Sequence, residues 1–137
     1  MSVREKEKIR ETLRIFFLAQ ETIDEKLFLT VWHPDARRFS YGSNDELYIF
    51  DTEAIFANQF DGIRQAKKAN PDFSVTYLIT RIKQNDIDKD NLISSATVEW
   101  QMLSMGQCIG VHYTYFHLVK IDGDWVITNV TDRGKEM

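Results

Sequence analysis

Residues 111–130 read VHYTYFHLVKIDGDWVITNV. Two runs rich in aromatic and β-branched side chains flank Asp122-Gly123-Asp124, and this combination is typical of two strands joined by a tight turn. Strands of this length predict a curved sheet. Such a sheet can wrap around amphipathic helices from the first half of the chain and leave a cavity for a small molecule between the layers.

A meander of four antiparallel strands is the arrangement that we expect for the second half of the chain. Residues 92–102 alternate apolar with polar side chains, which is the period of a strand buried on one face. Asn70-Pro71 marks the boundary before an earlier extended run, residues 73–83. Clusters of turn-forming residues separate the strands at residues 85–91 and 104–107.

Two amphipathic helices are expected at the start of the chain. In residues 3–20 apolar side chains recur with the spacing of one helical face, and charged side chains occupy the other face. Asp24 can cap a second helix. Pro34 forces His33 out of helical geometry, so this helix is expected to end at His33.

A small hairpin and a third helix complete the first half. Residues 36–41 and 46–50 look extended and are separated by turn-forming residues. Asp51 can cap the third helix, which is expected to stop at Asp61-Gly62, although residues 63–70 could continue as a short helix. The fold class is therefore α+β, with three N-terminal helices packed on a strongly curved, mainly antiparallel sheet.

Length and composition favour one domain that spans residues 1–137. The net charge of -4 does not attract nucleic acid. Cys108 is the only cysteine, and the first residues lack the apolar run of a secretory signal. Nor does any stretch approach the roughly 18 apolar residues of a membrane helix. We expect a reduced, cytoplasmic protein that binds neither nucleic acid nor membranes.

Two motifs carry a family resemblance: WHPDA at residues 32–36 and YFHLVKIDGDWVI at residues 115–127. With the order of helices and strands, they resemble the nuclear transport factor 2-like superfamily, whose fold is also called cystatin-like. The similarity covers nearly the whole chain and is closest to the bacterial branch named "putative lumazine-binding". It implies a cone-shaped fold, a pocket between helices and sheet, and homodimers formed through the sheet. It does not imply one activity, because this superfold hosts isomerases, dehydratases, cyclases and non-catalytic binders.

The resemblance disfavours steroid-isomerase chemistry for this chain. Ketosteroid isomerases of the superfamily carry a general-base aspartate in the strand after the Asp-Ala step. The same distance from Asp35-Ala36 leads to Ser40, which cannot replace that base. These enzymes also use a tyrosine on the first helix, where this chain offers Phe16 and Phe17.

Histidine is the usual acid or base near neutral pH, and the chain contains 3 histidines. His112 and His117 share one strand with opposite parity, so alternation places them on opposite faces. If Phe116 and Leu118 point inward, His112 does too, and His112 is the predicted catalytic residue. A β-bulge would reverse this assignment, and a core histidine satisfied by a hydrogen bond is the competing interpretation. His33 is expected to serve capping and packing.

A working site would need a second polar group near His112. The available candidates are Glu99, Asp35 and Asn129. Glu99 alternates against its apolar neighbours and is expected to face solvent or a dimer partner. Asn129 shares parity with Trp125 and Ile127, which predicts a His112–Asn129 pair on the inner face.

The predicted ligand-binding set combines the side chains expected around an inner cavity. Its members are Phe16, Trp32, Tyr41, Phe56, Phe60, Trp100, Met102, His112, Phe116 and Asn129. Ordinary core packing is the competing interpretation for most of the rings, and only one or two are expected to touch a cavity.

The sequence predicts no metal site and indicates no particular cofactor. Three residues match the first acidic positions of a calcium-binding loop: Asp86, Asp88 and Asp90. However, Asn91 and Thr97 stand where such a loop needs glycine and glutamate. We therefore expect an exposed turn.

Three functional hypotheses follow. The first is a homodimeric protein that binds an unidentified small molecule in a largely apolar pocket between helices and sheet. The second is an isomerase or dehydratase that uses His112 as acid or base. The third is a non-catalytic, dimeric interaction module whose pocket is filled by its own side chains and whose working face is the outer sheet surface around Tyr113, Tyr115 and His117.

Overall fold

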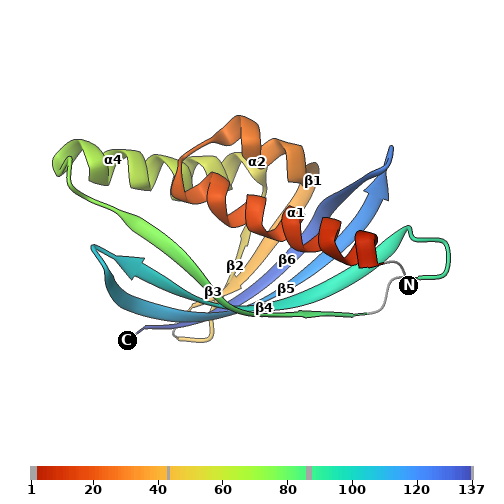
Figure 1. Cartoon of the computed structure of the whole chain (residues 1–137). Coiled ribbons are helices and arrows are strands. Elements are labelled where there is room, and N and C mark those ends of the chain that lie inside the picture. The colour runs from red at the N-terminus through yellow and green to blue at the C-terminus, as the bar shows by residue number, and fades with distance from the viewer. Residues whose placement is uncertain (1–2, 43, 86–87, 137) are drawn as a thin grey trace.

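The computed structural model describes residues 3–42, 44–85 and 88–136. Helices lie over one face of a single six-stranded sheet, as Figure 1 shows. The helical segments are α1 (Val3–Glu21), α2 (Glu25–Val31), α3 (Thr52–Ile55), the π-helix η1 (Phe56–Phe60) and α4 (Asp61–Ala69). The strands are β1 (Trp32–Tyr41), β2 (Leu47–Phe50), β3 (Val75–Gln84), β4 (Ile93–Ser104), β5 (Gln107–Ile121) and β6 (Asp124–Glu136).

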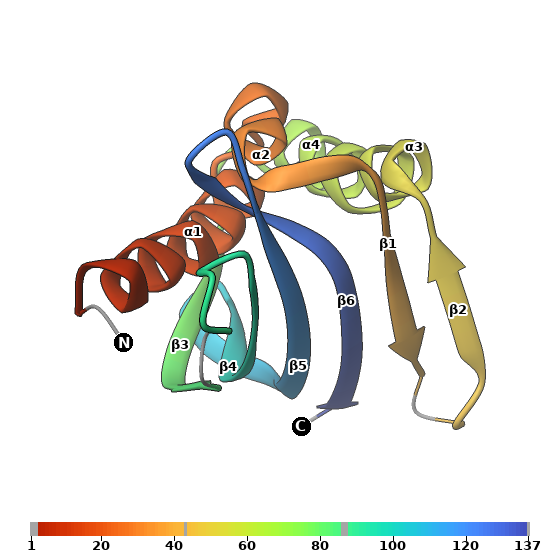
Figure 2. The same ribbon diagram turned by 90° about the vertical axis from the view of Figure 1, so that its right-hand side faces the viewer.

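The sheet order is β2-β1-β6-β5-β4-β3. The last four strands form the expected antiparallel meander, and β1 pairs with β2 as the expected hairpin. β1 also runs parallel to β6, which joins the hairpin to the meander. Figure 2 shows the edge strands β3 and β2 at the two sides, and the strands between them bend below the helices. The α+β fold class is confirmed.

The predicted helix caps are present. The Asp24 carboxylate accepts a hydrogen bond from the backbone N–H of Leu27 at 3.0 Å. In the same way Asp51 accepts from Ala54 at 2.8 Å. Each contact satisfies one of the N–H groups that a helix start leaves without a partner. α2, however, ends at Val31 and not at His33, because Trp32 already has extended backbone angles and begins β1.

The predicted helix stop at Asp61-Gly62 is wrong. The helix that Asp51 caps continues through η1 and α4 to Ala69. Gly62 costs about 1 kcal/mol in a helix interior, but Phe60 and Ile63 on either side of it are buried. Their burial outweighs that cost.

The turn between β5 and β6 takes the form that the sequence predicts. Asp122 and Gly123 have φ values of 51° and 86°. Two successive residues with positive φ match the right-handed twist of the flanking strands, and glycine adopts this conformation without strain.

Aromatic rings fill the space between α1 and the sheet. Phe16 lies at the centre of this core, with its ring centroid 5.1 Å from that of Phe116 and 5.9 Å from that of Trp32. Phe17 packs on Trp100 at 5.2 Å. A cavity of about 10 Å³ remains among Phe17, Tyr77 and Trp100. Within the described residues, no helix is both long and apolar enough to cross a membrane.

Candidate functional site

A cleft of about 280 Å³ opens where β1 and β6 end and β5 begins. Buried rings, among them Phe16 and Phe116, occupy most of the inner space expected from the sequence, so this rim cleft is the candidate site. It is lined by Arg38, Ser40, Tyr41, Gly42, Met102, Ile109, Gly110, His112, Asp132, Gly134 and Lys135.

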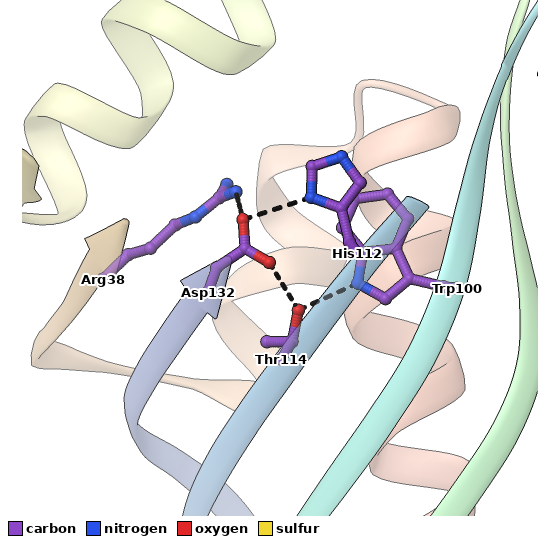
Figure 3. Close-up of polar contacts among 5 residues, drawn as sticks. All are labelled: Arg38, Trp100, His112, Thr114 and Asp132. Carbon is purple, nitrogen blue, oxygen red and sulfur yellow. Dashed lines mark hydrogen bonds and ion pairs between the residues drawn. The ribbon is translucent and has the colours of Figure 1, made fainter. Parts of the chain in front are cut away.

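A buried carboxylate joins two basic side chains at the base of the cleft. Asp132 on β6 is only 2% exposed. Its Oδ2 accepts a hydrogen bond from Arg38 Nη2 at 2.8 Å and lies 3.4 Å from His112 Nδ1. Figure 3 shows the guanidinium and the imidazole approaching this one oxygen from different sides. Three strands therefore meet at Asp132.

The second oxygen of the carboxylate belongs to another chain of hydrogen bonds. Trp100 Nε1 donates to Thr114 Oγ1 at 2.8 Å, and Thr114 Oγ1 donates to Asp132 Oδ1 at 2.7 Å. Both side chains are buried. Buried polar groups that are fully bonded hold one geometry, so this chain orients the carboxylate toward Arg38 and His112.

Asp132 remains ionised well below neutral pH. Burial alone would raise its pKa, but the hydrogen bond with His112 and the charge of Arg38 outweigh burial, and the pKa falls to about 2. An ionised carboxylate only accepts hydrogen bonds. His112 Nδ1 therefore carries a proton toward Asp132, and the lone pair of the neutral ring is on Nε2.

The imidazole of His112 is held on both sides. One face stacks on the indole of Trp100, with centroids 4.1 Å apart and an interplanar angle of 10°. On the neighbouring strand β6, Gly134 pairs with His112. A Cβ at Gly134 would lie 2.5 Å from His112 Cε1. Neither Gly134 nor Gly110 has a positive φ. Gly134 is thus needed for space and not for backbone conformation.

A β-bulge in β6 brings Asp132 to the inner face. Leu118 pairs with Ile127, but His117 pairs with Asn129, so β6 contains one extra residue. Ile127 and Val130 are both buried although three positions separate them, and Asp132 follows the parity of Val130. The predicted His112–Asn129 pair is therefore wrong, because Asn129 pairs with His117 and the partner of His112 is Asp132.

Sequence reasoning missed Asp132 for the same reason. Continuing the hairpin register from Leu118–Ile127 places Phe116 opposite Asn129. The available signal was the spacing between the apolar residues Ile127 and Val130, which does not fit the period of two. Had this spacing been interpreted as a bulge, Asp132 would have been placed beside Thr114 and close to His112.

The structure divides the predicted ligand-binding set. Tyr41, Met102 and His112 line the cleft, and Trp100 supports the imidazole from below. Four members are core residues with at most 5% exposure: Phe16, Trp32, Phe60 and Phe116. Phe56 lines a separate shallow groove beside the start of β1.

The remaining candidates lie elsewhere. Glu99 pairs with the exposed Tyr113, and Asp35 is exposed near the start of β1. His33 Nδ1 accepts a hydrogen bond from the backbone N–H of Asp35 at 3.0 Å, which is a local turn contact. His117 is exposed on the outer face of the sheet.

In the acidic turn at residues 85–91, Asp88 has a structural role. Asp88 accepts hydrogen bonds from the backbone N–H groups of Leu92 and Ile93 at 2.6 and 2.8 Å. These bonds lower the pKa of the Asp88 carboxyl. Asp86 lies outside the described residues.

The fold and the site can be compared with known proteins. The profile of a family described as "Putative lumazine-binding" matches residues 4–131. A search of the curated proteins found no match.

Solved structures share the fold at low sequence identity. A nuclear transport factor 2-like protein of unknown function from Methylobacillus flagellatus is 23% identical, with a TM-score of 0.65 over 98% of this chain and 95% of that one. A nuclear transport factor 2-like protein from Cytophaga hutchinsonii is 12% identical, with a TM-score of 0.71 over 98% and 100%. Hexachlorocyclohexane dehydrochlorinase LinA-type3 from Novosphingobium barchaimii is 12% identical, with a TM-score of 0.71 over 98% and 91%.

Proposed function

This chain belongs to the "Putative lumazine-binding" family of the nuclear transport factor 2-like fold, and we propose that it binds a small molecule in the rim cleft. His112 is the side chain that meets the ligand. The proposal keeps the small-molecule hypothesis drawn from the sequence but moves the site from the inner space to the rim. The floor of this cleft is polar, with Arg38, His112 and Asp132, and its walls include the apolar side chains of Met102 and Ile109.

The observation that carries the proposal is the fixed orientation of His112. Asp132 binds its Nδ1 edge and Trp100 stacks on one face, while the ring remains 19% exposed and lines the cleft. Holding a polar side chain in one orientation lowers the entropy cost of ligand binding. A histidine that served only the core would not need an accessible edge.

Native mass spectrometry tests this function first. Freshly purified protein is compared with the same sample after denaturation, and a releasable adduct of small mass is the expected result. Titration with compounds of that mass should shift the NMR signals of the His112 ring, which the His112→Gln variant assigns. His33→Gln, at the start of β1 and outside the cleft lining, is the control. Ligands that bind without moving the His112 signals would contradict the rim site.

A second candidate function is acid–base catalysis, as in an isomerase or dehydratase. The specific observation in its favour is the ionised Asp132 behind Nδ1, since a carboxylate in this position orients a histidine base and stabilises its protonated form. The dehydrochlorinase neighbour shares the fold alone at 12% identity. For an enzyme, His112→Ala abolishes turnover and leaves binding largely intact. For a binder, it changes affinity only.

We also propose a homodimer formed through the outer face of the sheet. Tyr113 and Tyr115 are 49% and 55% exposed there, and aromatic side chains are enriched at protein interfaces. Tyr115→Glu should convert the dimer to a monomer in native mass spectra, whereas Tyr48→Glu on the edge strand β2 should not. A wild-type protein that is monomeric at micromolar concentration would contradict this assembly and also the interaction-module hypothesis.

A further inference from the structure

We propose that the rim cleft takes a weak organic acid, such as a phenol, an enol or a cyclic imide, and binds it as the anion with the proton on His112. This inference rests on the proposed small-molecule function and names its ligand class. It follows from three features of the described residues: the free edge of His112, the groups that stabilise a protonated imidazole, and the size of the cleft.

The first feature is the base that the cleft presents. Asp132 directs the Nδ1 proton of His112 toward itself, so the lone pair of the neutral ring is on Nε2. Gly110 and Gly134 flank the ring and add no side chain there. A ligand O–H or N–H can donate to Nε2. When the proton transfers, the ligand bond to hydrogen breaks, its electron pair stays on the ligand atom, and an N–H bond forms on Nε2.

The second feature is the stabilisation of the product of this transfer. Protonated His112 would lie between the Asp132 carboxylate and the face of the Trp100 indole, and both attract a cation. The cation then holds the ligand anion through a charge-assisted hydrogen bond.

The charges around the cleft favour an anion as well. Both oxygens of Asp132 are already occupied, by Arg38 and His112 on one and by Thr114 on the other. Arg38 and Lys135 line the cleft and are cationic, and the Tyr41 phenol also faces it. After the proton transfer the lining therefore offers donors and positive charge, and the ligand anion supplies the acceptor.

The third feature is size. A volume of about 280 Å³ lies at the small end of ligand pockets. The walls contributed by Met102 and Ile109 suit the apolar body of a compact ring.

The test uses two probes that differ by one proton donor. 4-Nitrophenol is a weak acid whose absorption spectrum distinguishes the phenol from the phenolate, and 4-nitroanisole has the same ring system without the acidic proton. Both are titrated into the full-length protein at a pH at which free 4-nitrophenol is mainly neutral. Absorbance reports ionisation, and the NMR signal of the His112 ring reports occupancy of the cleft. The variants are His112→Gln and the control His33→Gln, which lies outside the cleft lining.

We expect 4-nitrophenol to bind with the spectrum of the phenolate and roughly tenfold or more tightly than 4-nitroanisole, because a charge-assisted hydrogen bond is lost in the ether. His112→Gln should abolish the spectral change, and His33→Gln should preserve it. Binding of 4-nitrophenol as the neutral phenol, or equal affinity for both probes, would overturn the weak-acid inference. A shifted His112 signal in either case would still support the rim cleft as the binding site. If neither probe shifted that signal, the weak-acid inference would fall, and native mass spectrometry would still decide the small-molecule function.

Discussion

At the scale of single residues, Gly134 determines where the His112 ring lies. A methyl group at this position would come within 2.5 Å of His112 Cε1 and 2.7 Å of Nδ1, so the ring has to move away from Asp132. We expect Gly134→Ala to weaken ligand binding roughly tenfold while the protein stays folded, because one charge-assisted hydrogen bond is lost. Ligand titration and far-UV circular dichroism measure the two effects.

The matched control for Gly134→Ala is Gly62→Ala. Gly62 lies in α4, and a methyl group added there would have no atom within 4 Å beyond its chain neighbours and the backbone of its own helix, so alanine meets no steric obstacle. Helix propensity predicts that this variant stabilises the protein by about 0.5–1 kcal/mol and leaves binding unchanged. Equal loss of binding in both variants would show that the cleft responds to any glycine substitution and not to the displacement of His112.

Asp132 links stability to pH. Its pKa is lowered from 3.8 to about 2 in the folded chain, so its ionisation stabilises the fold above pH 3.8, and this contribution is lost as pH falls toward 2. The shift corresponds to about 2 kcal/mol. Asp132→Asn should remove this part of the acid dependence.

The same variant should also lower stability at neutral pH by about 2–3 kcal/mol, because the partly buried Arg38 guanidinium loses a charge-assisted hydrogen bond to its counter-charge. Urea unfolding at pH 7, pH 4 and pH 2.5 measures both effects. If the free energy of unfolding fell equally with pH in the wild type and the variant, Asp132 would not be the cause of the acid dependence.

At the scale of elements, regular periodicity was predictable and its interruptions were not. The apolar stripe of α1 and the N-caps of α2 and α3 were predictable, because these signals are local. The π-helical segment η1 and the parallel pairing of β1 with β6 depend on tertiary contacts. The bulge in β6 had a local signal, the spacing of Ile127 and Val130, but its register became certain only from the pairing with β5. The inner position of His112 was therefore predictable, whereas its partner Asp132 was not.

The bulge itself can be tested by removing its extra residue. Deletion of Thr128 would restore the continuous register from the turn and move Val130 and Asp132 to the outer face. Because Val130 is buried and Asp132 holds Arg38, we expect a loss of several kcal/mol in the free energy of unfolding. Thr128→Ala, which keeps the chain length, should cost less than about 1 kcal/mol. Similar losses in the two variants, measured by urea unfolding, would argue against a role for the bulge in setting the register.

At the scale of the whole molecule, the long hairpin at residues 111–130 connects every layer. β6 lies between β5 and β1, and β5 carries Phe116 into the aromatic core beneath α1. The three tryptophans report on different parts of this arrangement: Trp32 begins β1, Trp100 lies in β4, and Trp125 lies in β6. All three are at most 6% exposed.

We propose that residues 1–137 form one domain, which should therefore unfold in one cooperative transition. Because each tryptophan is buried in a different strand, fluorescence follows the sheet as a whole, while far-UV circular dichroism at the helix band follows α1, α2 and α4. We expect urea unfolding curves from the two signals to coincide in midpoint and slope. The variants Trp32→Phe and Trp125→Phe, each lacking one reporter, should shift the midpoint but keep the two signals together. Fluorescence that changed before circular dichroism would show that the sheet and the helices unfold separately, and the rim cleft would then depend on the sheet alone.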